Sequence, residues 1–426
     1  MRALYTVVFY LCLPLVVARL LWRARLAPAY AQRWSERFGF CPARTDSRPA
    51  IWVHAVSVGE SLAAMAMIRE LQTRYPSHQL MVTTTTPTGS ERVLESLGDS
   101  VFHVYAPYDL PDCLNRFLRR TRPEIAIIME TELWPNTIAA CHKHQVAVVV
   151  ANARLSEKSA KGYQRLSAMA RPMLEKLSVV AAQHQDDGER FIALGLPRSS
   201  LQVTGNIKFD LTVTDNDRQR SMTFRQRWQS AHERPVLLAA STHQGEDELL
   251  LAALSLMQKQ QPDILLVLVP RHPERFESVF QLASENFVTQ KHSDVQPLTA
   301  GVKVLIGNTM GEMMPLLGAS DLVFMGGTWV DNGGHNFIEP AAWSKPMFSG
   351  SSLFNFAEVS RLLIEAGGLE VVETPEQLAA SALRVLGDPA QMTQMGQSAK
   401  RVADDNRGAL QRLLGAIDTQ LKSQPS

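Results

Sequence analysis

The sequence predicts an α/β protein made of two similar halves, each a mostly parallel sheet covered by helices. Two observations support this fold class. After about residue 50, short apolar runs alternate with helical patterns, and one polar stretch interrupts the alternation. The length of 426 residues fits two or three domains at roughly 100–200 residues each. The 45% hydrophobic and 20% charged residues exclude a disordered chain, a collagen-like chain and a coiled coil.

The first predicted element is an N-terminal membrane anchor over residues 1–25. Residues 3–18 form an apolar run without a charge, which is short for a span but sufficient with residues 20–22. A basic and aromatic stretch follows where a signal peptide would carry a small-residue cleavage site, so we expect an uncleaved anchor. The alternative is a helix lying in the membrane interface. The arginines after the run predict a cytoplasmic location for the remaining chain and contact with anionic head groups; they are Arg19, Arg23, Arg25, Arg33 and Arg37.

The first half, residues 26–212, shows a repeated strand–helix pattern. The expected strands are the short apolar runs Ile51–Ala55, Gln79–Thr83, Val101–Tyr105, Ile125–Met129, Ala147–Val150 and Val179–Ala182. The expected helices between them include Glu60–Arg74, Asp112–Arg120 and Ala160–Lys176.

A polar linker over Asp210–Ser221 separates this pattern from its continuation in residues 213–426. The expected strands of the second half are Val236–Ala240, Ile264–Val269, Val302–Ile306, Leu322–Met325, Pro346–Ser349 and Glu370–Val372. The tail after Asp388 is expected to be helical and could pack back on the first domain. Ligands of such sheets lie beyond the carboxyl ends of the strands, so we expect the active site in a cleft between the two domains.

Several classes of protein are disfavoured by what the sequence lacks. A net charge of +1 gives no reason to expect nucleic-acid binding. The four cysteines form no CxxC pair, which makes a structural zinc site unlikely on spacing alone. There is no GxGxxG after a strand, no GxxxxGK[ST] and no GxSxG. These absences disfavour nicotinamide oxidoreductases, P-loop nucleotidases and serine hydrolases.

In the first half, charged residues end or follow predicted strands. Glu60 follows the turn of HAVSVGE, where it would either stabilise the first helical turn or act as a general base. Glu130 and Glu132 in ETELWPN end a buried strand, and alternation would place both on one face; one of them could instead cap the next helix. Lys208 in GNIKFD lies at the domain junction, where it would face an anionic ligand or simply be solvated.

The second half carries the residue types that bind anions. STHQGED opens a helix after a strand, and VPRHPERF places Arg271 and His272 directly after another strand. The glycine-rich segment GGTWVDNGGHNFIEPAAW precedes a helix and predicts a phosphate or sugar cradle. The alternative is a purely structural loop. His335 and Glu339 are four residues apart, a spacing that would also suit a metal ion, but no third ligand is evident.

Taken in order, the motifs HAVSVGE, ETELWPN, GNIKFD, STHQGED, VPRHPER, MGEM and GGHNFIEPAAW resemble the 3-deoxy-D-manno-octulosonic acid (Kdo) transferases of lipopolysaccharide synthesis, glycosyltransferase family 30. The resemblance extends from the basic anchor to about residue 390. It implies the GT-B fold, with two Rossmann-like domains facing a cleft. It also implies that the N-terminal domain binds the acceptor and the C-terminal domain binds the CMP-sugar.

The resemblance further implies an inverting transfer of one or two Kdo residues from CMP-Kdo to the 6′-hydroxyl of lipid IVA at the bacterial inner membrane, among its lipids. By position, Glu60 is the implied proton acceptor, and Glu130 and Lys208 are the implied transition-state stabilisers. No cofactor and no metal are implied. The implied CMP contacts are Pro270, Arg271, Met310, Gly311, Glu312, Asn336, Phe337, Ile338 and Glu339.

Two other functions remain compatible with the residues. One is a different GT-B enzyme, such as a nucleotide-sugar epimerase or a transferase that uses a diphosphate donor. The other is a membrane-attached sugar-binding module without catalysis. The membrane anchor and the order of the motifs disfavour the first, and the charged residues Glu60, Glu130 and Lys208 at the ends of elements disfavour the second.

Overall fold

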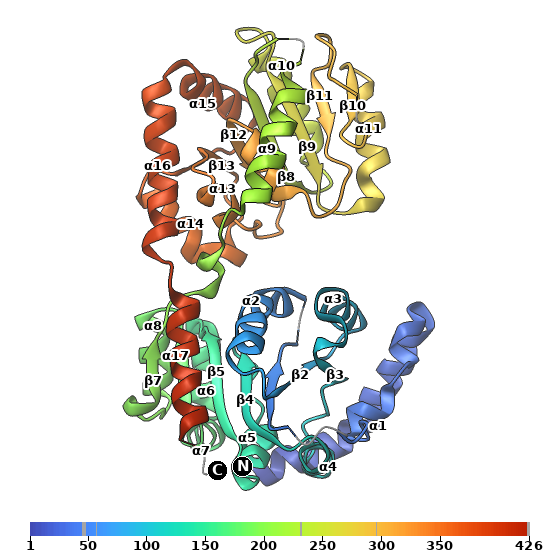
Figure 1. Ribbon diagram of the computed structural model, residues 1–426, viewed down its shortest axis with the longest axis vertical. Helices are drawn as coiled ribbons and strands as arrows, with labels where there is room; N and C mark the ends of the chain where they lie inside the picture. The colour runs from blue at the N-terminus through green and yellow to red at the C-terminus, as the bar shows by residue number, and fades with distance from the viewer. Residues whose placement is uncertain (45–47, 57, 231, 295, 424–426) are drawn as a thin grey trace. The chain divides into compact units, whose positions relative to one another are not determined.

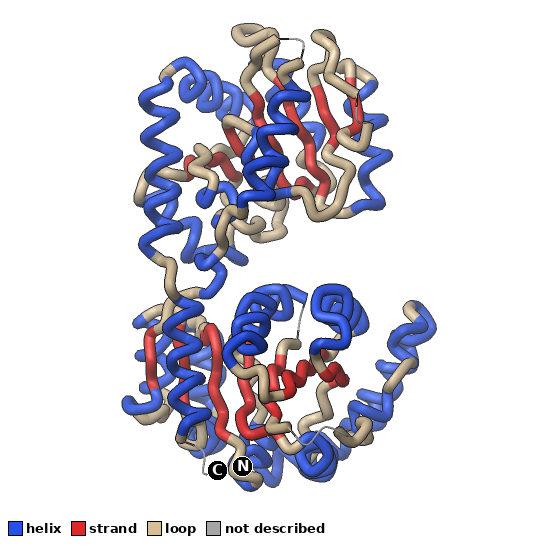
Figure 2. The backbone as a smooth tube through the Cα atoms, in the orientation of Figure 1, coloured by secondary structure: helices blue, strands red, loops and turns tan. Residues whose placement is uncertain are grey.

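A computed structural model describes residues 1–44, 48–56, 58–230, 232–294 and 296–423 (Figure 1). The side chains of Leu26 and of residues 58–63 are outside this description. The chain divides into two compact units. Unit 1 contains Met1–Asp210 together with Arg407–Ser426, and unit 2 contains Leu211–Asn406. In each unit a sheet is covered by helices (Figure 2), which confirms the predicted α/β class.

Unit 1 is built around a seven-stranded parallel sheet in the order β3-β2-β1-β4-β5-β6-β7. Three of its strands are buried along their whole length and three more at all but one position, which explains why they read as continuous apolar runs. The strands are β1 (Ala50–His54), β2 (Gln79–Thr84), β3 (Phe102–Tyr105), β4 (Pro123–Met129), β5 (Ala147–Ala153), β6 (Val179–Ala182) and β7 (Leu201–Val203).

The helices of unit 1 connect these strands, except for one at each end of the chain. The α-helices are α1 (Arg2–Leu26), α2 (Val58–Arg74), α3 (Pro87–Leu97), α4 (Pro111–Thr121), α5 (Pro135–Lys143), α6 (Glu157–Arg165), α7 (Ser167–Leu174), α8 (Gln185–Ala193) and α17 (Ala409–Lys422). The 3-10 turns are η1 (Pro28–Ala31), η2 (Trp34–Phe38), η3 (Gly98–Ser100), η4 (Arg198–Ser200) and η5 (Ile207–Asp210). The single helix expected over Ala160–Lys176 is wrong, because the chain leaves helical geometry at Leu166, between α6 and α7.

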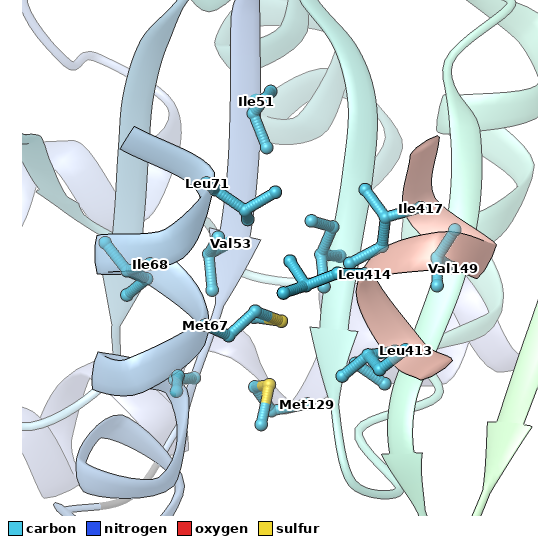
Figure 3. Packing of buried hydrophobic residues seen from close by; sticks show 14 of the residues in the cluster. Ile51, Val53, Met67, Ile68, Leu71, Met129, Val149, Leu413, Leu414 and Ile417 are labelled. Atoms are coloured by element: carbon cyan, nitrogen blue, oxygen red, sulfur yellow. The ribbon is translucent and has the colours of Figure 1, made fainter. Parts of the chain in front are cut away.

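The last helix of the chain completes the core of unit 1. Side chains of α17 point toward those of β1 and α2 in one apolar cluster (Figure 3). Leu413, Leu414 and Ile417 of α17 are fully buried there. Since burying one such side chain stabilises a fold by about 1.5–3 kcal/mol, α17 is a major part of this core.

The first helix, α1, is the one helix among the described residues that is long and apolar enough to cross a membrane. It runs past α4 and α5 of unit 1 (Figure 1). The Tyr10 hydroxyl donates to Asp112 of α4 at 2.6 Å, and the Thr6 hydroxyl and Asn136 of α5 are 3.1 Å apart. Most other α1 side chains are exposed, which is consistent with a membrane anchor.

Two of the five arginines expected to meet lipid head groups are held inside unit 1. Arg33 donates to both carboxylate oxygens of Glu36 at 2.8 and 3.0 Å, and to the main-chain oxygen of His103. Arg37 is only 5% exposed. The expectation is therefore wrong for Arg37, which is buried in η2, whereas Arg33 is bound to Glu36 but stays about one-third exposed.

Unit 2 repeats the architecture with the strand order β10-β11-β9-β8-β12-β13-β14, again parallel. Its strands are β8 (Val236–Thr242), β9 (Leu265–Pro270), β10 (Thr289–Lys291), β11 (Val304–Ile306), β12 (Leu322–Met325), β13 (Met347–Ser349) and β14 (Leu369–Val371). Its helices are α9 (Asp215–Trp228), α10 (Asp247–Met257), α11 (Phe276–Ser284), α12 (Met313–Ala319), α13 (Ile338–Ala342), α14 (Ala357–Glu365), α15 (Pro375–Gly387) and α16 (Pro389–Asp405), with 3-10 turns η6 (Pro273–Arg275) and η7 (Phe354–Phe356).

The expected polar linker is largely helical. Thr214 caps α9 through a capping box, in which its hydroxyl accepts from the main chain of Asp217 and the Asp217 carboxylate accepts from the main chain of Thr214. Two otherwise unpaired main-chain donors are thereby satisfied. The polar composition of residues 210–221 thus reflects a capped surface helix rather than an extended connection.

Candidate active site

The strand order predicts where each unit binds ligands. In an open parallel sheet the ligand lies beyond the carboxyl ends of the strands where the order reverses. In unit 1 this point is between β1 and β4, and in unit 2 it is between β8 and β12. The segments that follow these four strands contain six of the twelve predicted catalytic and CMP-binding residues, which are Glu60, Glu130, Asn336, Phe337, Ile338 and Glu339.

In unit 1 the structure brings Glu130 and Lys208 together. Lys208 Nζ lies 3.6 Å from Glu130 Oε1, and both side chains are about one-third exposed. Glu130 comes directly after β4, and Lys208 belongs to η5. Two residues far apart in the sequence thus form one accessible ion pair near the carboxyl end of β4.

The backbone at Glu130 explains why it separates from Glu132. Its φ of 55° is left-handed, an uncommon conformation for a residue other than glycine. Strand β4 has already ended at Met129, so the expected strand alternation of Glu130 and Glu132 is wrong. Glu132 instead accepts the indole N–H of Trp134 at 3.0 Å.

Lys208 is held from both sides of η5. The buried Asn152 accepts the main-chain N–H of Ile207 at 3.1 Å. Asp210 accepts the main-chain N–H groups of Gly408 and Leu410, each at 2.5 Å, at the beginning of α17. A carboxylate is favoured at the N-terminus of a helix, so α17 fixes the segment that carries the lysine.

Glu60 falls within α2 close to its beginning. Its side chain is outside the described part of the structure. Its role as proton acceptor therefore stays a prediction. The strand β1 that precedes it is adjacent to β4 in the sheet, so Glu60 and Glu130 follow neighbouring strands.

In unit 2 three histidines gather at the point where the strand order reverses. His243 follows β8 and stacks on His335, with ring centroids 5.0 Å apart and the two Nε2 atoms 2.8 Å apart. His272 meets His243 edge-on at 5.5 Å. Burial, helped by neighbouring His243 and Arg271, lowers the pKa of His335 to about 4, so it is neutral at pH 7. The separate motifs predicted polar residues after these strands but not that the histidines form one cluster.

Arg271 and Glu339 face the same region. The Arg271 main chain is fixed by a bond from its N–H to the Thr242 oxygen at 3.0 Å, and its side chain is exposed. Asn336 donates to Glu339 at 3.1 Å. Burial raises the pKa of Glu339, while Asn336 and the positive charge of Arg271 act in the opposite direction. A cation, a carboxylate and an amide are thus available to a polar ligand.

The other predicted CMP contacts differ in how accessible their side chains are to a ligand. Phe337 and Ile338 are fully buried, so a ligand would meet their main-chain atoms. Met310 is 55% exposed, and Gly311 has a left-handed φ of 75°. Glu312 forms an ion pair with Arg220 of α9 and lies 3.4 Å from His292. Pro270 is buried at the end of β9.

The main-chain N–H groups after β12 already bind an anion of the protein itself. Glu246 is fully buried and accepts from Gly327 at 2.7 Å and from Thr328 and Trp329 at 3.0 Å. The expected cradle for a ligand phosphate at these three amides is therefore wrong. The carboxylate of Glu246 accepts from the main-chain N–H groups that the glycine pair 326–327 turns inward.

The beginning of α10 is also unavailable as a simple anion site. Asp247, its first residue, accepts from the Thr242 hydroxyl at 2.6 Å and forms an ion pair with Arg275. Acidic side chains thus complement the positive end of this helix. Across the described residues, no three His, Cys, Asp or Glu side chains gather as a metal-binding group.

Comparison with known proteins identifies the family. Residues 32–211 match the family model described as 3-Deoxy-D-manno-octulosonic-acid transferase (kdotransferase). The chain is 41% identical over 424 residues to a 3-deoxy-D-manno-octulosonic acid transferase of Haemophilus influenzae, covering 99% of both chains. It is 32% identical to the transferase of that description from Bordetella pertussis, again covering 99% of both.

Solved structures confirm the GT-B type of fold. UDP-GlcNAc 2-epimerase from Neisseria meningitidis, bound to UDP-GlcNAc, matches with a TM-score of 0.60, covering 87% of this chain and 100% of the epimerase. Its 16% identity supports shared architecture alone. The family model and the full-length identity to two transferases decide the assignment: the chain belongs to the 3-deoxy-D-manno-octulosonic acid transferases, the glycosyltransferases that transfer Kdo in lipopolysaccharide synthesis.

Proposed function

We propose that this transferase moves Kdo from CMP-Kdo to the 6′-hydroxyl of lipid IVA, with inversion at the anomeric carbon. The observation that carries the proposal is the Glu130–Lys208 ion pair, which lies at the carboxyl side of the unit 1 sheet in a member of the Kdo transferase family. Unit 1 then takes the acceptor and unit 2 takes the nucleotide, and one or two Kdo residues are added.

The reaction is a single displacement. The acceptor oxygen attacks the anomeric carbon, the bond from that carbon to the phosphate oxygen breaks, and CMP leaves with the electron pair. Glu60 accepts the proton of the hydroxyl, a task for which a carboxylate is suited. Glu130 supports the positive charge that develops on the sugar, and Lys208 supports the negative charge on the leaving phosphate.

On the donor side, Arg271 is the cation that meets the CMP phosphate. Asn336 and Glu339 then contact the polar part of the nucleotide, and the neutral His335 supplies a hydrogen bond without adding charge. The remaining contacts come from Pro270, the Met310–Glu312 loop and the main chain of residues 337–338.

We also propose that α1 anchors the protein in the bacterial inner membrane with both units on the cytoplasmic side. Arg23 and Arg25 lie in the last turn of α1, where they meet anionic lipid head groups. Replacing both with Gln should weaken sedimentation with anionic vesicles several-fold. Replacing Arg33, which is already bound to Glu36, should not. Equal binding by wild type and the double variant would contradict this placement.

The function is tested with full-length protein in detergent, lipid IVA and CMP-Kdo, by mass spectrometry of the lipid. Whole Kdo units should be added by the wild type, and the number of units is counted directly. Glu60→Gln, Glu130→Gln and Lys208→Met should each reduce the rate. CMP-Kdo replaced by a UDP-sugar should give no product. A folded wild type that leaves lipid IVA unchanged would refute the proposed donor or acceptor.

A further inference from the structure

A small cavity lies beyond the carboxyl ends of β1 and β3 in unit 1, beside α1. Its volume is about 160 Å³, and its aromatic walls include Phe9 of α1, Trp52 of β1, Tyr108 and Trp134. That volume equals roughly five water molecules at about 30 Å³ each. Sites for whole ligands are usually roughly 300–1,000 Å³. The cavity therefore fits one chemical group of a larger molecule.

The unusual member of its lining is Arg37. Its side chain is 5% exposed, and its guanidinium carbon lies 4.4 Å from the ring centre of Tyr105. Among the described residues nothing accepts a hydrogen bond from its buried Nε–H. Glu36, the adjacent carboxylate, is bound by Arg33 instead. A buried cation without an acceptor is costly, which indicates an anionic ligand.

The two carboxylates that line the cavity already have partners of their own. Asp109 accepts from the main chain and the hydroxyl of Thr137 at 2.6 and 2.7 Å. Glu132 accepts from Trp134 at 3.0 Å. Neither forms an ion pair with Arg37 in the described part of the chain. An anion that enters the cavity would therefore meet a cation that contacts the Tyr105 ring but, among the described residues, forms no ion pair with either carboxylate of the lining.

Two further side chains of the lining can donate to such an anion. Tyr108 and His54 both line the cavity. Burial lowers the pKa of His54 to about 4, so its imidazole is neutral at pH 7. Its Nδ1 lies 2.8 Å from the Thr83 hydroxyl, which accepts from Trp52, so the hydroxyl donates to Nδ1 and Nε2 carries the N–H donor. The phenol of Tyr108 supplies an O–H donor. With Arg37 these groups offer three kinds of donor around one small volume.

We propose that this cavity binds a phosphate group of the lipid acceptor, with Arg37 as its cationic ligand. Phe9 belongs to the helix that is apolar enough to cross a membrane, so a phosphate carried by a lipid reaches the cavity from the membrane side. The apolar walls then cover the carrier next to its charged group. That the lipid is lipid IVA rests on the proposed function.

The test compares lipid IVA, which carries two phosphates, with its two monophosphorylated forms, at saturating CMP-Kdo. For the wild type, loss of the bound phosphate should raise KM by roughly 10- to 100-fold, the effect of one buried charge-assisted hydrogen bond. Arg37→Met should raise KM for lipid IVA by a similar factor and remove the discrimination between the acceptors. Arg37→Lys should restore part of the discrimination between the acceptors. Discrimination that persists in Arg37→Met would overturn the proposal.

Arg33→Gln is the matched control, because its guanidinium lies over the same Tyr105 ring at 5.1 Å but is bound to Glu36. It should keep the discrimination. Thermal unfolding without lipid separates binding from structure. Arg37→Met should have an unchanged or higher Tm, since it removes a buried cation without an acceptor. A markedly lower Tm with an unchanged KM would assign Arg37 a structural role and overturn the proposal.

A binding measurement keeps the two proposals distinguishable. The rise in Tm on adding lipid IVA in detergent needs no transfer, and it should be larger for the wild type than for Arg37→Met. If transfer fails while this difference in Tm is present, the proposed function is refuted but the proposal that the cavity binds a lipid phosphate is not. Inorganic phosphate should not reproduce the rise. If millimolar phosphate gives the same Arg37-dependent rise, the cavity binds free anions and the lipid assignment is overturned.

Discussion

The packing of α17 predicts that a substitution near the end of the chain destabilises unit 1 and not unit 2. Leu414 is fully buried in the cluster that also contains Val53 of β1 and Leu71 of α2 (Figure 3). In sequence α17 follows α16, the last helix of unit 2. Leu414→Ala should therefore weaken a sheet that is formed by residues far away in the sequence.

The expected size follows from complete burial. Leu→Ala at a fully buried site costs about 2–5 kcal/mol, depending on how far the cavity collapses. A domain has a total stability of about 5–15 kcal/mol, so the loss is a large part of it. Amides of β1 and β4 that exchange only on unfolding of unit 1 should then exchange roughly 30-fold to several thousand-fold faster.

Hydrogen exchange followed by mass spectrometry measures the protection of amides in each unit in one sample. Peptides from β1 and β4 should lose protection, and peptides from β8 and β9 should not change. Leu378→Ala in α15 is the matched control, because Leu378 is fully buried in the core of unit 2. It should give the reverse pattern. Faster exchange in β8 and β9 of the Leu414→Ala protein would refute the assignment of α17 to unit 1.

Three further predictions concern the site and the pH dependence. Asp210 accepts hydrogen bonds from the main chain at the beginning of α17 and so links this helix to the segment that carries Lys208. Asp210→Asn should therefore lower Tm by about 2–4 °C, measured by thermal unfolding, and also lower kcat, measured by transfer kinetics. Glu130→Gln and Lys208→Met should each lower kcat by roughly 10²–10³, and the double variant should lose less than the product, because the two side chains form one ion pair. Burial and the charge of Arg33 lower the pKa of His103 to about 4, so on acidification the unfolded chain binds a proton at this residue before the folded chain does. The free energy of unfolding should therefore fall as pH decreases from about 6.5 to 4, by up to roughly 1.4 kcal/mol per pH unit. Urea titrations should find this slope reduced in His103→Gln.

The strands could be predicted from the sequence because both faces of each sheet are covered. Runs such as 125–129 and 264–269 are apolar at every position, and local composition is enough to find them. The marginal strands β7 and β10 were not predicted. Each is three residues long and at best half-buried at the edge of its sheet, so little apolar pattern marks it.

Local signals in the sequence bear on two differences between the expected and the observed helices. Thr214 and Asp217 have the spacing of a capping box, which marks the beginning of α9 within the polar stretch at the division between the two units. The split between α6 and α7 has a weaker signal. Pro172 cannot donate a main-chain hydrogen bond and so weakens the helical pattern, but it lies within α7 and does not mark the break at Leu166.

The glycine-rich loop shows why chemistry is harder to predict than strands. Glycines before a helix do turn main-chain N–H groups inward, as the sequence suggests. Which anion they bind depends on Glu246, a residue eighty or so positions earlier that looks like an ordinary member of a helix start. Since a buried carboxylate satisfies these three donors in the way that a ligand phosphate would, only the three-dimensional arrangement shows which anion they bind.

The position of Lys208 depends on the same kind of long-range arrangement. Its segment η5 ends at Asp210, whose carboxylate is held by the first main-chain N–H groups around the beginning of α17. Arg412 of α17 donates to the main-chain oxygen of Thr204, just before η5. Helix α17 is in turn held by the buried side chains that it shares with β1 and α2. The hydrophobic packing of the last helix therefore sets the geometry of the Glu130–Lys208 ion pair, and core substitutions in α17 should change the transfer rate before they unfold the protein.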